Sequence, residues 1–184
     1  MYQYFLCLVI TCVIVEIDSC TMNKSNKKPS YVPTLSSSPA CCDEWEDASN
    51  VSLGYLWFEQ QAQLNYSQAV SFCEERLSYP IEINSKNQLN FVINKLNVIS
   101  ENVEDLTLGG APAKAWWGSA TDKEEQGTWK WPQSGKPVEK FVWADDEPNK
   151  YGEEHNFCLL NWYQYKGADV AGSHMMYPLC QQKK

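Results

Sequence analysis

Apolar residues recur at helical spacing in two neighbouring segments of this chain. Residues 66–77 place their apolar side chains on one helical stripe. Residues 84–97 do the same after a polar residue suited to cap a helix. The apolar positions are Ala69, Val70, Phe72, Cys73 and Leu77 in the first segment, and Leu89, Val92, Ile93 and Leu96 in the second. The pattern therefore predicts two helices early in the chain.

Short aromatic-rich runs lie on both sides of these helices. Residues 52–61 (SLGYLWFEQQ) are typical of a strand, and residues 101–115, which contain GGAPA, indicate a loop. After Lys114 the runs AWWGSATD, GTWKW, FVW and FCLLNWYQY alternate with Gly, Pro and Asp turns, which predicts several short strands. The order of strand, two helices and a series of strands predicts an α+β fold.

The N-terminal 40 residues differ in pattern from the rest. Residues 1–20 contain an apolar run, Phe5 to Val15, which predicts a signal peptide and is too short to span a membrane as a helix. Residues 21–40 are rich in Ser, Pro and Lys and predict a flexible linker. Residues 41–184 are then one folded domain. Because no second long apolar stretch follows, we expect a secreted, extracellular protein without a membrane span.

Charge and composition narrow the partners. The 184-residue chain has a net charge of -8, and its eight Trp and ten Tyr can build a packed core. An acidic chain is a poor candidate for nucleic acid or for an anionic membrane surface. The charge is compatible with cation binding.

Secretion gives the cysteines and sequons a meaning. Asn23, Asn50 and Asn65 each begin an N-x-S glycosylation sequon. Removal of the signal peptide takes Cys7 and Cys12, and Cys20 with a later cut. The remaining cysteines are Cys41, Cys42, Cys73, Cys158 and Cys180. In an oxidising compartment most should form disulfides. These five are an odd number, which leaves at least one thiol free or paired with another chain, whereas a cut before Cys20 would retain Cys20 and restore an even count.

Several motifs then occur in an order that is specific to one family. They are Tyr66-Ser67-Gln68-Ala69 with Cys73, Trp116-Trp117-Gly118, Gly127-Thr128-Trp129-Lys130-Trp131, Glu147-Pro148-Asn149, Cys158 and Cys180. From about Cys41 to Gln181 the chain resembles the C-type lectin-like domain family. The resemblance implies two helices with small antiparallel sheets and a long loop region for calcium and ligand.

The resemblance also implies a pattern of disulfides. Cys73 should pair with Cys180, which closes a loop worth about 4–5 kcal/mol in the chain-entropy model. Cys158 matches the family's second cysteine, but Gly172 occupies the position of its partner. The N-terminal cysteine pair of longer family members is incomplete too, because Cys41 or Cys42 matches one cysteine and Gly54 occupies the position of the other. A disulfide-linked dimer through Cys41 or Cys42, a local N-terminal bond and a free buried Cys158 all stay open.

In sugar-binding members of the family, the Glu-Pro-Asn loop holds one Ca²⁺ ion. Glu147 and Asn149 match its two ligands, around a proline that is cis in the family. The next ligand is either Glu154 or Asn156. Calcium prefers six to eight oxygen ligands, and two sugar hydroxyls then complete the shell. The order Glu-Pro-Asn implies mannose-type sugars.

The last part of that calcium site departs from the family pattern. The family's Trp-Asn-Asp falls on Gly167, Ala168 and Asp169, so that only the final carboxylate is kept. A second calcium position of some members falls on Asp122, Gln126 and Lys150. Because a lysine repels the ion, we expect that second position to hold no calcium.

Two functions fit these observations. One is a secreted lectin that binds mannose-type glycans on cell or microbial surfaces through one Ca²⁺ ion, which by analogy suggests innate immunity. The alternative is a calcium-independent domain of the same fold that binds a protein or another ligand. An enzyme is not expected, because His155 and His174 have no evident nucleophile or metal-ligand spacing. Trp162 and Tyr163 after the loop serve either packing or sugar stacking.

Overall fold

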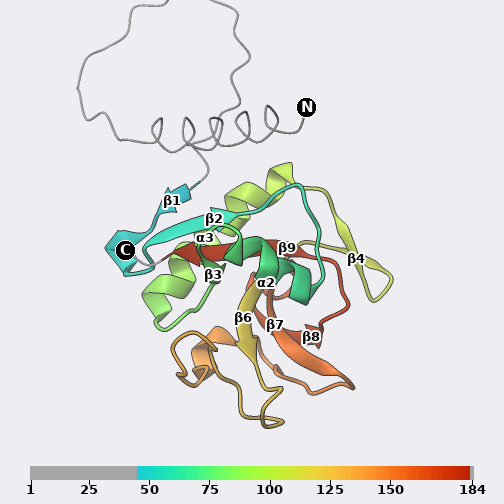
Figure 1. Cartoon of the computed structure of the whole chain (residues 1–184). Helices are drawn as coiled ribbons and strands as arrows, with labels where there is room; N and C mark the ends of the chain where they lie inside the picture. Colours follow the sequence, from blue (N-terminus) through green and yellow to red (C-terminus); the bar gives the residue numbers. More distant parts are fainter. Residues whose placement is uncertain (1–44, 183–184) are drawn as a thin grey trace, which may run out of the picture. The chain divides into compact units, whose positions relative to one another are not determined.

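The computed structural model describes residues 45–182 of the chain (Figure 1). The predicted signal peptide and linker, with Asn23, Cys41 and Cys42, lie outside the described residues and stay predictions. Within residues 45–182 no helix is both long enough and apolar enough to cross a membrane.

One mixed sheet organises the described residues. Its strand order is β1-β2-β9-β6-β7-β8, and β3 pairs with β9 beside this path. The strands are β1 (Trp45–Asp47), β2 (Tyr55–Phe58), β3 (Tyr79–Pro80), β6 (Ala115–Thr121), β7 (Glu154–Leu160), β8 (Lys166–Ala171) and β9 (Tyr177–Gln182). All pairs are antiparallel except β6 with β9. The last strand is therefore central, and it joins the early strands to the β6–β8 part of the sheet (Figure 1).

The two predicted helices are present and explain their sequence pattern. Helix α2 (Tyr66–Glu74) begins at a capping box. The Asn65 side chain accepts the backbone N–H of Gln68, and the Gln68 side chain accepts the backbone N–H of Asn65. Helix α3 (Lys86–Ile99) begins at Ser85, whose hydroxyl accepts the Gln88 N–H. Helix α2 ends earlier than predicted, because Leu77 adopts a left-handed conformation and is 85% exposed. The two helices and the sheet confirm the α+β class.

The structure corrects several of the predicted short elements. In FVW, Phe141 and Val142 belong to a 3-10 helix, η3 (Lys140–Val142), and Trp143 follows it, while GTWKW forms only isolated bridges through Lys130. FCLLNWYQY divides into β7 and a 3-10 helix, η4 (Asn161–Tyr163). Three-residue aromatic runs are buried in either conformation, so their pattern does not separate a strand from a turn.

The predicted loop at residues 101–115 contains a hairpin. After the 3-10 turn η2 (Ser100–Asn102), β4 (Leu106–Leu108) pairs with β5 (Ala111–Ala113). Gly109 and Gly110 both have positive φ, which a two-residue hairpin turn of this hand requires. The remaining 3-10 turn, η1 (Ser49–Val51), lies between β1 and β2.

A disulfide joins Cys73 of α2 to Cys180 of β9, with a separation of 107 positions in sequence. This is the pair that the family resemblance implies. It fixes the first helix to the central strand. Cys158 is the free cysteine of the described residues, and it is buried.

The core around β7 depends on one phenylalanine. Phe157 is fully buried, and its ring packs edge-on against Trp131 and Trp143. The same ring occupies the space beside Gly118 and Gly167, where an added Cβ would lie 2.7 and 2.2 Å from it. Phe157 therefore fills the volume next to Gly167, the position where the family pattern has a tryptophan.

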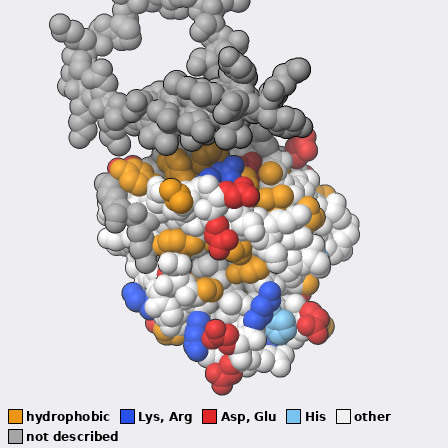
Figure 2. Space-filling view, viewed as in Figure 1, with side chains coloured by type: hydrophobic (Ala, Val, Ile, Leu, Met, Phe, Trp, Pro, Cys, Tyr) orange, Lys and Arg blue, Asp and Glu red, His pale blue; other side chains and the backbone are white. Residues whose placement is uncertain are grey.

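Charged side chains gather at the end of the molecule opposite β1. Figure 2 shows basic and acidic side chains together there, where Figure 1 draws the loops between β6 and β7. The predicted calcium loop belongs to this end of the molecule.

Candidate functional site

Four predicted ligands line one small hollow beside β8. Glu147 and Asn149 come from the loop before β7, Glu154 is the first residue of β7, and Asp169 lies on β8. The hollow has a volume of about 240 Å³. The Glu147–Pro148 peptide bond is cis, as the resemblance implies.

Asp169 attaches the loop to the sheet. Its side chain is buried, and its two carboxylate oxygens accept the backbone N–H groups of Asn149 at 2.8 Å and Lys150 at 2.9 Å. Hydrogen bonds to a charged acceptor are stronger than neutral ones. The single carboxylate kept from the Trp-Asn-Asp pattern therefore positions the Glu-Pro-Asn loop.

The other side chains of the hollow bond to one another. Asn149 Nδ2 donates to Glu147 Oε1 at 3.1 Å, and Asn149 Oδ1 accepts the Tyr151 N–H at 3.0 Å. The Tyr151 N–H also donates to Glu154 Oε2 at 3.1 Å. The Tyr163 hydroxyl interacts with the Glu147 carboxylate, whereas the sequence pointed to Tyr163 only for packing or sugar stacking. The oxygens of the hollow are thus held in place before any ligand binds.

The carboxylates of the hollow repel one another. Burial, and then the neighbouring Asp169, raise the pKa of Glu147 to about 7. Burial and the charge of Asp169 also raise the pKa of Glu154. A cation among these groups would relieve the repulsion, since an opposite charge favours the ionised carboxylate.

The donor set fits calcium in kind. Three carboxylates and the Asn149 amide offer only hard oxygen ligands, which Ca²⁺ prefers. Among residues 45–182, no group of three or more His, Cys, Asp and Glu side chains is arranged to hold a metal ion. The fit to calcium is therefore one of ligand type, in the three carboxylates and the Asn149 amide.

The structure separates the two alternatives for the next ligand. Glu154 lines the hollow, whereas Asn156 does not. A bulge in β7 lies between the two residues, and the Asn156 side chain is 1% exposed. Its Oδ1 atom is buried without a hydrogen-bond partner in the described part of the chain. Of the two residues, only Glu154 lies where its side chain could be a ligand of an ion in this hollow.

The structure also corrects the register that was expected for Cys158. Cys158 lies opposite Ala168, and Asn156 lies next to Gly172, where an added Cβ would be 2.8 Å from Asn156 Nδ2. Counting back from Cys180 does not record the strand register, which pairs Asn156 with Val170 and shifts between Glu154 and Asn156. The side chain that reaches Gly172 is therefore Asn156 and not Cys158.

Cys158 belongs to the core. It packs in the cluster that contains Trp117 and Ala168. Burial, followed by the charges of Glu147 and Asp169, raises the pKa of its thiol well above the usual range. A buried thiol of this kind is chemically inert.

Basic side chains lie at the position of the family's second calcium. Asp122 is buried, accepts the Gly127 N–H at 2.7 Å, and pairs with His155 Nδ1 at 2.8 Å. Lys150 Nζ lies 2.8 Å from where a Cβ on Gly127 would be. Asp122 is thus already paired with an imidazole. The sequence pattern pointed to Lys150 here but not to His155.

The remaining site residues fall at the edges of the hollow. Trp162 is 45% exposed and donates from Nε1 to the Pro112 carbonyl at 3.0 Å. Ala168 lines the hollow, as do Trp162 and Tyr163.

Two of the three predicted glycosylation sequons lie within the described residues. Asn50 is exposed on η1, and Asn65 caps α2.

Comparison with known proteins identifies the family and the fold. Residues 62–182 match the family model described as the lectin C-type domain. The chain is 27% identical over 133 residues to human "C-type lectin domain family 17, member A", covering 71% of this chain and 30% of that protein. It is 23% identical over 130 residues to the "Hepatic lectin" of Gallus gallus, covering 70% of this chain and 55% of that protein.

Solved structures share the fold. The carbohydrate-recognition domain of the mouse scavenger receptor C-type lectin aligns with a TM-score of 0.60 at 20% identity, covering 78% of this chain and 97% of that one. The chain thus spans about a third to a half of the length of the two relatives, and nearly all of the solved domain. The family is one of binding proteins and not of enzymes. The chain belongs to the lectin C-type domain family.

Proposed function

We propose that this protein is a secreted lectin that binds mannose-type glycans through one Ca²⁺ ion held by Glu147, Asn149, Glu154 and Asp169. The observation that carries the proposal is the meeting of these four oxygen-bearing side chains, from a loop and two strands, around one open hollow. The names of the relatives, a hepatic lectin and a carbohydrate-recognition domain, support a glycan as the ligand.

A calcium ion in this hollow would supply free coordination positions for two adjacent sugar hydroxyls. The side chains then have separate roles. The Glu147 carboxylate accepts a hydrogen bond from one hydroxyl, and the Asn149 amide donates one to a sugar oxygen. The Tyr163 hydroxyl orients Glu147. The half-exposed Trp162 offers an apolar face at the rim.

The wider role follows from secretion. The predicted signal peptide and the sequons at Asn23, Asn50 and Asn65 support an extracellular glycoprotein. Its partners would be mannose-type glycans on cell or microbial surfaces, a role in innate immunity. A disulfide-linked dimer through Cys41 or Cys42 would add a second binding site and raise avidity.

Calcium titration followed by thermal melting tests the proposal. We expect calcium to stabilise the wild type by about 2.7 kcal/mol at 100 times its dissociation constant, with a further increase on adding mannose. Glu147→Gln should abolish both effects, whereas Glu101→Gln, an exposed change outside the hollow, should keep them. The wild type should also stay on mannose resin until a chelator is added.

Ala168→Asn offers a gain-of-function test. Ala168 lines the hollow without a ligand atom, so the substitution adds one amide oxygen at the position that the family pattern fills. We expect the calcium dissociation constant to fall about tenfold, which corresponds to about 1.4 kcal/mol of binding free energy. A melting temperature that calcium leaves unchanged in both proteins, with no retention on the resin, would overturn the proposal and favour the calcium-independent alternative.

A further inference from the structure

A second, larger hollow adjoins the candidate calcium hollow at Glu147, which lines both. We name it the lysine groove. It has a volume of about 780 Å³, within the range of about 300–1,000 Å³ that small-molecule sites occupy. Its walls come from α3, from the segment around η3 and from the start of β8. The groove therefore extends the binding surface away from the sugar position at Glu147.

The floor of the lysine groove is apolar. Leu89 of α3, Phe141 and Trp143 line it, and Phe141 remains partly exposed. Aromatic and aliphatic surfaces of this kind pack against the C–H faces of a ligand, while a few polar groups fix its orientation. Because Leu89 and Trp143 are themselves buried, Phe141 provides the exposed apolar surface of the groove.

The groove is lined by three lysines and three carboxylates, so its charges balance overall and only their separation can favour an anion. Lys86 and Lys140 are exposed, and Lys166 is half-buried. None of the three takes part in an ion pair among residues 45–182, although Lys95 and Lys114 elsewhere do. In a protein with a net charge of -8, three unpaired lysines around one hollow are available to an external anion.

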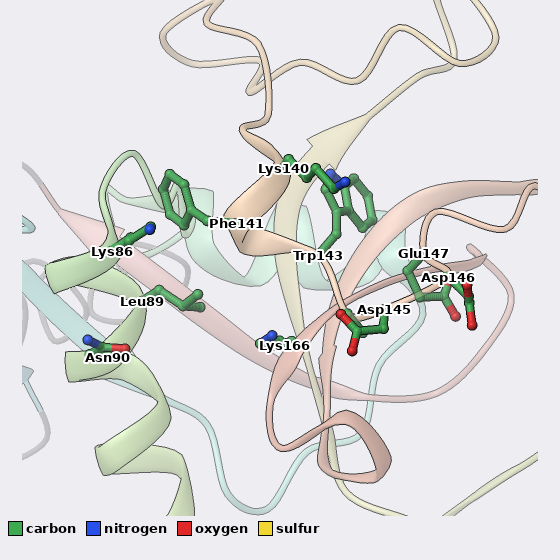
Figure 3. Close-up of a pocket in the computed structure, with 11 residues that line it drawn as sticks. Lys86, Leu89, Asn90, Lys140, Phe141, Trp143, Asp145, Asp146, Glu147 and Lys166 are labelled. Carbon is green, nitrogen blue, oxygen red and sulfur yellow. The ribbon is translucent and has the colours of Figure 1, made fainter.

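The acidic residues of the groove lie apart from Lys86. Figure 3 shows Asp145, Asp146 and Glu147 together at one end, and Lys86 with Leu89 and Asn90 on α3 at the other. Lys166 lies between these two groups in the view. An anion is repelled at the Glu147 end and attracted at the α3 end, so its place is beyond the sugar unit that contacts Glu147.

We infer that the lysine groove binds the sugar unit next to the calcium-bound one, and that this neighbouring unit carries an anion, either a sulfate ester or a carboxylate. The inference rests on the proposed function, because Glu147 must hold the first sugar unit. It narrows the ligand from any mannose-type glycan to an acidic one. Both anions accept hydrogen bonds from lysine ammonium groups.

Binding of three matched oligosaccharides tests the inference. The probes are a neutral mannose disaccharide, the same disaccharide with a sulfate ester on its second unit, and one with a uronic acid as the second unit. With calcium present, we expect the wild type to bind at least one acidic probe about tenfold more tightly than the neutral one, as two exposed lysines and one half-buried lysine can provide. The two acidic probes distinguish sulfate from carboxylate.

A triple variant and a matched control locate the effect. Lys86→Gln, Lys140→Gln and Lys166→Gln together should bring the acidic-to-neutral affinity ratio to about one, with neutral binding unchanged. Lys123→Gln, Lys130→Gln and Lys136→Gln together remove the same charge outside the groove and should keep the ratio. The ratio in the wild type should fall as the ionic strength rises.

The possible results separate the two proposals. Calcium-dependent binding of the neutral probe, with no preference for either acidic probe, overturns the groove but not the proposed function. An equal loss of preference in both triple variants also overturns the groove, because the effect is then one of overall charge. No binding of any probe, together with no calcium-induced change in melting temperature, overturns both.

Discussion

The two ends of the sheet stabilise themselves in different ways. In the covalent half (β1–β3, α2 and β9) a disulfide links Cys73 to Cys180 across 107 residues. The ligand half (β6–β8 and the loops between them) has no disulfide among its residues, and the Asn156 side chain lies against Gly172 after β8. There, Asp169 accepts two backbone N–H groups and Phe157 fills the space beside two glycines. Packing and one buried carboxylate thus stand beside the candidate calcium loop where the other half has a covalent link.

The two halves also treat a carboxylate differently. Burial works against ionised Glu59 in the covalent half, but the backbone N–H groups of Ala62 and Gln61 lower its pKa below the ordinary value. In the ligand half, burial and Asp169 raise the pKa of Glu147 to about 7. Glu59 is satisfied within the fold, whereas Glu147 gains from a cation or a proton.

Removing the disulfide of the covalent half should have the largest effect. We expect Cys73→Ala with Cys180→Ala to lower the free energy of unfolding by about 4–5 kcal/mol, since the closed loop is long. Urea denaturation of both proteins measures the change. Cys158→Ala, which keeps the disulfide, should cost about 1 kcal/mol. A loss below that of the control would show that the link matters little.

Adding a disulfide to the ligand half should remove the difference in covalent stabilisation between the two halves. We expect Asn156→Cys with Gly172→Cys, in a Cys158→Ala background, to form a bond and add about 3 kcal/mol to the free energy of unfolding. Mass spectrometry and urea denaturation, with and without reductant, measure both. If Gly172→Cys alone forms a bond with native Cys158, the observed register is wrong.

Filling the space next to Phe157 tests the packing that replaces the link. Gly167→Ala would put a Cβ 2.2 Å from the Phe157 ring and 3.1 Å from the Val142 carbonyl oxygen, which should cost about 1–3 kcal/mol. Combining it with Phe157→Leu should cost less than the sum of the two single changes, measured by a double-mutant cycle in urea. Additive costs would mean that the two positions do not share this space.

The contributions of Glu147 and Glu59 to the pH dependence of stability should have opposite signs. The folded-state pKa of Glu147 lies above its ordinary value of 4.5, so the folded protein binds more protons between about 4.5 and 7. Without calcium, the free energy of unfolding should therefore fall as pH rises through that window. Glu154 acts in the same direction. Because these groups are partly exposed, we expect a change of about 1 kcal/mol or less.

For Glu59 the folded-state pKa is lowered, so its contribution is present above about 4.5 and is lost as pH falls below that value. Melting temperatures between pH 3 and 8 would measure both limbs. Glu147→Gln should reduce the decline between about 4.5 and 7, and Glu59→Gln should reduce only the loss in acid. A decline that is unchanged in Glu147→Gln would contradict the assignment.

Much of the fold follows from local patterns. The stripes of apolar residues at helical spacing and the polar caps Asn65 and Ser85 predicted α2 and α3. The hairpin at Gly109 and the η3 turn were missed, because short runs satisfy several backbone conformations equally well. For the site, the motif at Glu147 and Asn149 located the loop, but motif counting put Cys158 in the wrong register.

The sequence by itself determined the helices, the α+β class, the family resemblance and the residue types of the candidate calcium loop, since each depends on residues close together in the chain. Only the tertiary structure decided which side chains meet. It placed Glu154 in the hollow and Asn156 outside it, put Phe157 beside Gly167, and grouped Lys86, Lys140 and Lys166 around one groove. The physical reason is that the bulge in β7 and the η4 turn between β7 and β8 set which residues face each other, and motif spacing along the chain does not record the register.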